Sequence, residues 1–254
     1  MTTNGATPTN CFAWRSSSSM RNLGRRLLES VAAAVFPPRC ALCSRALPTL
    51  DIVCMQCESL LPSFEGPCCQ RCNEPVDDPS IDLCQRCGTM DYEVDRILSL
   101  GPYRGGWGRL IRAFKFDREM AIGRWLGSRL AAACLAQSEF RQFDAVTFVP
   151  MTRQDKRKRG FNQAEVLARR IAKRLNLPLS TMLVKTRETA LQSKLSAAQR
   201  STNLRDAFRL LPSVQEQVLL VDDIYTTGAT VEECARTLKR GGAKSVVVAT
   251  VARA

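Results

Sequence analysis

Two groups of residues in this sequence have types and spacings suited to chemistry. The first is residues 222–230, Asp-Asp-Ile-Tyr-Thr-Thr-Gly-Ala-Thr, which follow the apolar run Val218–Val221 and precede a stretch with helical periodicity. Adjacent carboxylates can accept hydrogen bonds from sugar hydroxyls or face a divalent cation. A small, hydroxyl-rich loop at the start of a helix binds phosphate through backbone amides. The combination indicates a site for a sugar phosphate.

The second group is eight cysteines in four C-x-x-C pairs, Cys40/Cys43, Cys54/Cys57, Cys69/Cys72 and Cys84/Cys87. Two such pairs can surround one metal ion tetrahedrally and leave no open position for water. Four pairs therefore predict up to two structural zinc ions, most simply bound by pairs that are neighbours in sequence. A cross-braced pairing, first with third and second with fourth, is an open alternative, and so is a disulfide framework.

The chain of 254 residues contains no histidine. This excludes Ser-His-Asp and Cys-His nucleophile systems, HExxH metalloproteases and an imidazole general base. It also means that any zinc must be held mainly by thiolates. Positioning and electrostatics could still support catalysis without an imidazole.

The formal net charge of +13 is concentrated in one part of the chain. Residues 151–210 hold fifteen lysines and arginines and four acidic residues, whereas the flanking segments are nearly balanced. Such a basic band implies an anionic ligand, which could be a phosphate compound, nucleic acid or a membrane surface. Aromatic residues are scarce in the band, which holds only Phe161 and Phe208, so a base-stacking platform there is weakly supported.

Strands and helices are expected to alternate from Arg96 onward, which predicts an α/β fold with a parallel sheet and helices on both faces. The expected strands are Arg96–Tyr103, Ala145–Val149, Thr181–Val184, Val218–Val221 and Ser245–Val251, and the expected helices are 107–116, 119–136, 162–175, 195–205 and 230–240. Residues 37–90 carry few large apolar groups, so they need cross-links, either metal ions or disulfides, to fold. We therefore divide the chain into a tail or mis-annotated start (1–22), an N-terminal helix with the zinc module (23–90) and the α/β domain (91–254).

The stretch from Val218 to Thr230 resembles the phosphoribosyl-diphosphate (PRPP) signature of type I phosphoribosyltransferases. The resemblance implies that Asp222 and Asp223 contact the ribose hydroxyls. It also implies that Thr226, Thr227, Gly228, Ala229 and Thr230 hold the 5′-phosphate. PRPP, bound with Mg²⁺, carries a diphosphate leaving group, whose negative charge the basic residues would stabilise. Arg157, Arg159 and Gly160 are expected on the diphosphate side of the site.

The whole of residues 37–254 resembles the ComF family, competence-associated proteins with a cysteine-rich region before a phosphoribosyltransferase-like domain. The resemblance rests on the cysteine pairs, Arg159-Gly-Phe-Asn-Gln163, Thr189-x-x-Gln192-x-x-Leu195, Arg200-x-x-Asn203 and the PRPP loop, in that order. Pro150-Met151-Thr152 departs from it, because the family usually has a second proline there. Arg187, Gln192, Arg200 and Asn203 are expected in a flexible lid.

The resemblance implies a magnesium-dependent enzyme that transfers phosphoribose from PRPP to an unknown acceptor and releases diphosphate. The alternative is a non-catalytic accessory protein that binds PRPP and single-stranded DNA, with competence or DNA-processing proteins as partners. No apolar stretch is long enough to span a membrane, and a cytoplasmic location is expected.

Overall fold

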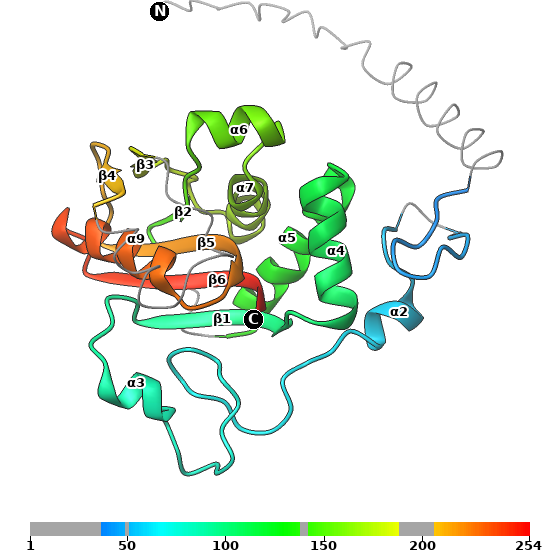
Figure 1. Ribbon diagram of the computed structural model, residues 1–254, viewed down its shortest axis with the longest axis horizontal. Coiled ribbons are helices and arrows are strands. Elements are labelled where there is room, and N and C mark those ends of the chain that lie inside the picture. The colour runs from blue at the N-terminus through cyan, green and yellow to red at the C-terminus, as the bar shows by residue number, and fades with distance from the viewer. Residues whose placement is uncertain (1–36, 49–50, 138–141, 188–205) are drawn as a thin grey trace, which may run out of the picture.

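The computed structural model describes residues 37–48, 51–137, 142–187 and 206–254 (Figure 1). The tail expected over 1–22, the helix expected before residue 37 and the helix expected over 195–205 lie outside these ranges. Four parallel strands form the central sheet in the order β1-β6-β5-β2. They are β1 (Arg96–Pro102), β2 (Ala145–Phe148), β5 (Gln217–Tyr225) and β6 (Ser245–Arg253).

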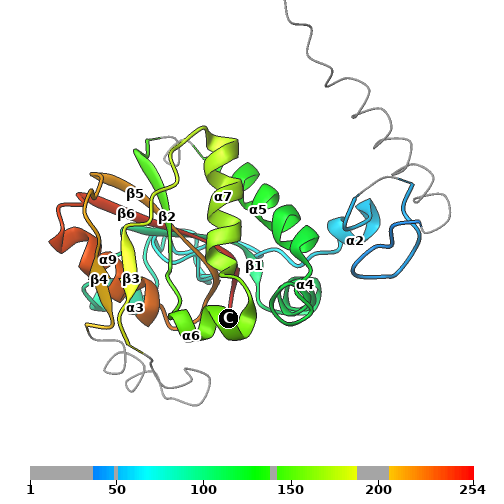
Figure 2. The ribbon, with the colours of Figure 1, turned by 90° about the horizontal axis from the view of Figure 1, so that it is seen from above.

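Helices cover both faces of this sheet, as the alternation of elements predicted (Figure 2). One face carries α4 (Gly105–Phe116), α5 (Met120–Leu135) and α7 (Gln163–Leu175), and the other carries α9 (Ala229–Arg240). The central strands are apolar on both sides, because both sides are buried. The doubly covered sheet places the carboxyl ends of β2 and β5 side by side.

Strand β5 is longer than the apolar run that predicted it. It continues through Asp222 and Asp223 to Tyr225, because β6 pairs with it over this whole length. Asp222 lies opposite Thr250, and Tyr225 lies opposite Arg253. The two acids therefore lie inside the strand and not after its end.

The basic stretch after β2 forms a helix that the sequence analysis did not predict, α6 (Arg153–Arg159). Its first turn is capped by the Thr152 hydroxyl, which accepts a hydrogen bond from the Asp155 amide at 3.0 Å. It ends at Gly160, whose φ of 90° lies in the left-handed region that favours glycine. The cap and the glycine fix both ends of this short helix.

The strand expected over Thr181–Val184 forms at Leu183–Lys185 (β3), but outside the central sheet. It pairs antiparallel with β4 (Phe208–Leu210), which the sequence analysis did not predict. The two short strands hold together the ends of the segment between them, and Thr186 extends the ladder by donating to the Ala207 carbonyl.

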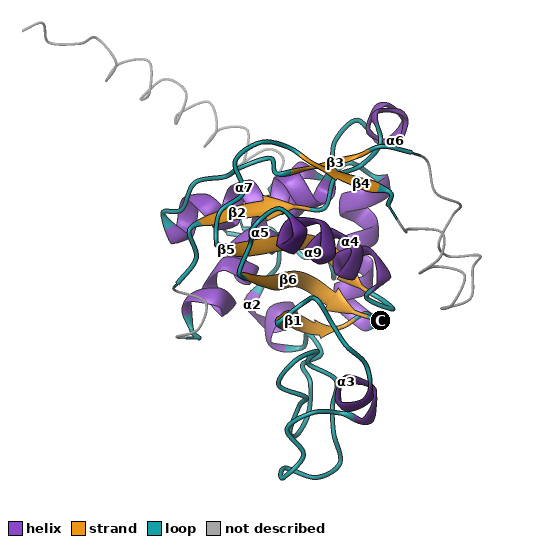
Figure 3. Ribbon diagram, turned by 90° about the vertical axis from the view of Figure 1, so that its left-hand side faces the viewer, coloured by secondary structure: helices purple, strands orange, loops and turns teal. Residues whose placement is uncertain are grey.

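Two small cysteine-rich modules precede the sheet, each with one short helix, α2 (Met55–Ser59) and α3 (Gln85–Thr89). We call residues 37–59 the first ribbon and residues 67–89 the second ribbon. The first ribbon lies beside α4, and the second lies below β1 (Figures 1 and 3). Among the described residues, no helix has the length and apolarity needed to cross a membrane.

Candidate ligand cleft and metal centres

A cleft of about 660 Å³ opens where β2 and β5 end. Ligands of open α/β sheets bind at this edge, beyond the carboxyl ends of the strands. The acids of β5 form one part of its lining, and the rest comes from α4, the turn after it, the segment after β2, α6, the start of α7 and β3. Its charged and polar lining residues are Lys115, Arg118, Asp155, Lys158, Arg159, Asn162, Gln163, Lys185, Asp222 and Asp223.

The two acids of β5 meet a lysine that the sequence analysis did not list among site residues. Lys115 Nζ, at the end of α4, lies 2.6 Å from Asp223 Oδ2. Asp222 Oδ1 accepts a hydrogen bond from the Asp223 amide at 2.8 Å. Burial, and then the neighbouring Asp223 carboxylate, raise the pKa of Asp222 to about 7. The sequence feature that could have pointed to Lys115 is its place between two phenylalanines. Phe114 is buried in the core, so it fixes this end of α4 and the position of Lys115.

The helical form of α6 decides which basic residues reach the cleft. Asp155, Lys158 and Arg159 line it, since residues three and four apart share a helix face. Arg157 and Gly160, both expected on the diphosphate side, are not among the lining residues. The Arg159 guanidinium lies 5.5 Å from the centre of the Phe116 ring, at the same cleft.

Arg118 completes the basic wall, and its donation to the Lys158 carbonyl at 3.2 Å joins α6 to the turn between α4 and α5. Lys185 extends the wall from the end of β3. Of the four residues expected in a lid, Arg187 lies two residues beyond β3 and is exposed. Gln192, Arg200 and Asn203 fall outside the described residues.

Gln163 is a site candidate whose role the sequence analysis did not assign. The residue is only 4% exposed and lines the cleft, and its Nε2 has no hydrogen-bond partner among the described residues. Neighbouring Asn162 is fully engaged, because it donates to the Val149 carbonyl and accepts from the Ala164 amide, both at 3.0 Å. A buried donor without a partner is costly unless a ligand supplies the acceptor. Gln163 is the first residue of α7, and the helix dipole favours an anion at this end.

The threonine-rich loop expected to hold the 5′-phosphate runs from the end of β5 into α9. Gly228 caps this helix with a φ of 83°, and a Cβ there would lie 2.5 Å from the Tyr225 hydroxyl. Only glycine fits this position without strain. Thr226, Thr227, Ala229 and Thr230 flank it, so the first amides of a twelve-residue helix begin where the acid-bearing strand ends.

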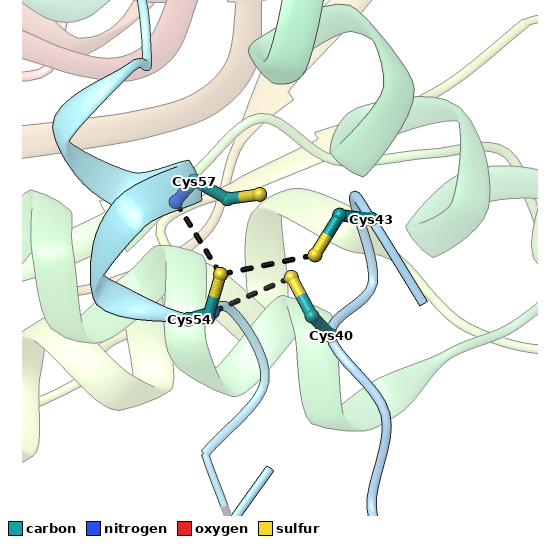
Figure 4. Close-up of side chains that lie close together, drawn as sticks. All are labelled: Cys40, Cys43, Cys54 and Cys57. Atoms are coloured by element: carbon teal, nitrogen blue, oxygen red, sulfur yellow. Dashed lines mark hydrogen bonds between the residues drawn. The ribbon is translucent and has the colours of Figure 1, made fainter. Parts of the chain in front are cut away.

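The eight cysteines of the C-x-x-C pairs form two clusters of four, and the pairing is sequential. Within each cluster all sulfur atoms lie within 4.8 Å of one another, Cys40/Cys43/Cys54/Cys57 (Figure 4) and Cys69/Cys72/Cys84/Cys87. Representative distances between Sγ atoms are 3.8 Å for Cys43 to Cys54 and 3.7 Å for Cys72 to Cys84. A tetrahedron with Zn–S bonds of about 2.3 Å has edges of about 3.8 Å. The clusters thus fit zinc, and the sulfurs are too far apart for disulfides.

In each cluster, backbone amides favour the thiolate form of one cysteine, the form that zinc requires. Cys54 donates to Cys40 Sγ at 3.4 Å and Leu42 donates to it at 3.5 Å. Burial alone would raise the pKa of Cys40, but hydrogen bonds from the backbone of Cys54, Cys43 and Leu42 lower it to about 6. In the second cluster, backbone hydrogen bonds lower the pKa of Cys69 to about 7 in the same way.

The sheet, the cleft at its carboxyl edge and the two cysteine clusters define a phosphoribosyltransferase-like protein that carries two zinc ribbons. Residues 162–254 match the family described as phosphoribosyl transferase domain, and residues 31–89 match the double zinc ribbon domain.

The chain belongs to the ComF family of competence-associated proteins. It is 30% identical to competence protein F of Haemophilus influenzae over 80% of this chain and 90% of that protein. It is 33% identical to a DNA utilization protein of Escherichia coli over 82% of this chain and 87% of that protein. Competence protein ComFC of Streptococcus pneumoniae is 24% identical over 85% of this chain and its own full length.

Proposed function

We propose that this protein binds PRPP with Mg²⁺ in the cleft and transfers the phosphoribosyl group to an acceptor. The observation that carries the proposal is the acid pair of β5, which opens into a cleft with a basic wall and leads directly into the phosphate loop. Asp222 and Asp223 would accept hydrogen bonds from the ribose hydroxyls. The amides and threonine hydroxyls of residues 226–230 would hold the 5′-phosphate.

The basic wall supports diphosphate as the leaving group. In the transfer, the bond between the ribose C1 and the diphosphate oxygen breaks, and the diphosphate leaves with the electron pair. A new bond then joins C1 to the acceptor, which loses a proton. Lys158, Arg159 and Gln163 line the cleft and would stabilise the negative charge that develops on the leaving group. Magnesium, when bound with PRPP, neutralises part of the same charge.

Calorimetry with Mg²⁺ and PRPP tests the binding part of this proposal. Wild type should bind and gain thermal stability, and the Asp222→Asn, Asp223→Asn double variant should lose both effects, because the ribose hydroxyls lose their charged acceptors. Glu216→Gln is the matched control, since it removes one acidic charge far from the cleft. Glu216 is exposed, pairs with Lys244 and lies just before the start of β5, whereas the acid pair lies near its end. If wild type shows no heat of binding and no thermal shift, the proposal is wrong. Diphosphate release with candidate acceptors then tests transfer.

A second candidate function is a non-catalytic accessory protein that binds PRPP and single-stranded DNA. The observation that favours it is a groove of about 440 Å³ between α5 and α7, with Met120, Phe161 and Val166 among its apolar residues. Basic residues surround these groups, namely Arg124, Lys156, Arg169, Arg170 and Lys173. One acid, Glu165, also lines the groove and pairs with Lys156 at 2.9 Å and with Arg169 at 3.1 Å. Cations along an apolar floor suit the backbone and bases of a single strand. The names of the relatives, which refer to competence and DNA utilization, agree with this function.

Filter binding with single-stranded DNA tests this second function. The double variant Arg169→Ala, Lys173→Ala should weaken DNA binding about tenfold at low salt, since two phosphate contacts are lost. PRPP binding should be unchanged, because neither residue lines the cleft. Equal DNA binding by the variant and wild type would remove the groove as the DNA site.

A further inference from the structure

The second ribbon contacts the loop that is proposed to hold the 5′-phosphate. Arg86 lies between the zinc ligands Cys84 and Cys87, and its Nη2 donates to the carbonyl oxygen of Thr227. The two residues are 141 positions apart in the sequence. A side chain anchored by two metal ligands therefore reaches the middle of the phosphate loop.

A second set of contacts joins the same ribbon to the strand that leads into the loop. Arg253, at the end of β6, donates to the carbonyl of the zinc ligand Cys72 at 2.8 Å and pairs with Glu74. Its guanidinium lies 5.0 Å from the centre of the Tyr225 ring. Tyr225 in turn packs against Gly228, the cap of α9. The ribbon thus supports the loop directly through Arg86 and indirectly through Arg253 and Tyr225.

The first ribbon offers an internal comparison, because it has the same four-cysteine arrangement but different neighbours. Two helices of the α/β domain hold it. Arg109 of α4 donates to the Leu42 carbonyl at 3.1 Å, and Arg129 of α5 pairs with Glu58 at 2.7 Å. The position that corresponds to Arg86 is Gln56, which accepts from Arg45 within the ribbon at 3.1 Å. The contact with the phosphate loop is therefore a property of the second ribbon's sequence.

We infer that the second ribbon is part of the PRPP site and that Arg86 is a positioning residue for the phosphate loop. A loop that binds phosphate through its amides must turn its carbonyls away, because a carbonyl oxygen repels an anion. By binding the Thr227 carbonyl, Arg86 holds this peptide in one orientation, and its charge favours an anion nearby. Zinc in the second ribbon keeps Arg86 in place. The inference rests on the proposed PRPP site.

Calorimetry with Mg²⁺ and PRPP on the full chain tests the role of Arg86. Arg86→Ala should raise the Kd about 3- to 10-fold, the loss expected when one ordinary hydrogen bond is removed. Arg86→Lys should restore part of the affinity, since it keeps the charge and a donor. Gln56→Ala is the matched control in the first ribbon and should bind as wild type does. All variants should keep two zinc ions and an unchanged melting temperature.

Loss of a single zinc site provides the second measurement. Cys84→Ser should weaken PRPP binding by at least as much as Arg86→Ala, whereas Cys54→Ser, the corresponding change in the first ribbon, should leave it unchanged. Zinc analysis establishes that each variant has lost one ion. If wild type binds PRPP and Arg86→Ala binds it equally well, the inference is overturned and the proposed function stands. If wild type does not bind PRPP, the proposed function itself fails.

Discussion

The purified protein should contain two zinc ions per chain, and Cys40→Ser and Cys69→Ser should each reduce that content to one. The two clusters share no cysteine, so each site should be lost independently. Structural zinc contributes about 10–16 kcal/mol of apparent binding free energy in small zinc modules, which far exceeds what such short segments gain from their own core. Loss of an ion should therefore unfold the ribbon that held it.

Limited proteolysis with mass spectrometry should locate this unfolding. Cleavage should appear within residues 37–59 for Cys40→Ser and within residues 67–89 for Cys69→Ser, while the α/β domain stays protected. Cys134→Ala is a suitable control, because Cys134 is buried in α5 outside both clusters and should keep both ions. A zinc-free wild type with oxidised cysteines would contradict the prediction.

Asp222→Asn should stabilise the ligand-free protein at pH 8 and abolish its binding of PRPP. The pKa of Asp222 is raised to about 7 because folding buries the carboxyl group and places it beside Asp223. Ionisation therefore costs more in the folded state than in the unfolded state. Asparagine removes this cost and keeps an oxygen that accepts from the Asp223 amide.

The pH dependence of this effect has a definite sign. A carboxyl group whose folded pKa is raised destabilises the protein as pH rises from its ordinary pKa, near 4, to its folded pKa, near 7. The stability gained by Asp222→Asn should therefore be small at pH 4, grow over this window and stay constant above it. A shift of this size corresponds to roughly 2–4 kcal/mol once partial hydration at the cleft is considered.

Thermal unfolding at pH 5 and pH 8 checks this expectation. The difference in melting temperature between the variant and wild type should be larger at pH 8. The control Glu216→Gln, at an exposed acid, should show no such change between the two pH values. A variant that is less stable than wild type at pH 8 would show that the Asp222 carboxylate is stabilised by its surroundings.

Much of the fold could be predicted from local pattern. The apolar runs that became β1, β2, β5 and β6 and the amphipathic stretches that became α4, α5 and α7 are visible in the sequence, because burial on one or both faces fixes their period. The helix α6 was missed because a run of basic residues has no apolar periodicity. Its ends are instead set by the Thr152 cap and by Gly160.

The site divides in the same way between sequence and structure. The cysteine pairs and the acid-threonine loop are short motifs whose spacing alone indicates their chemistry. Lys115 and Gln163 could not be assigned, since their importance depends on what surrounds them in the fold, the Asp223 carboxylate for Lys115 and the cleft for Gln163. Arg157 was expected in the cleft and is not part of its lining, because a helix turns only some of its residues to one side.

The sequence by itself indicated which residues could bind ligands, cysteines for zinc and two acids with a threonine-rich loop for the proposed sugar phosphate, because these motifs depend on residues close together in the chain. Tertiary structure alone decided the sequential pairing of the cysteine clusters and the extension of β5 through its two acids. It also decided the contact of Arg86 with Thr227. Each of these results from segments far apart in the sequence, whose packing is set by the whole core and not by local preference.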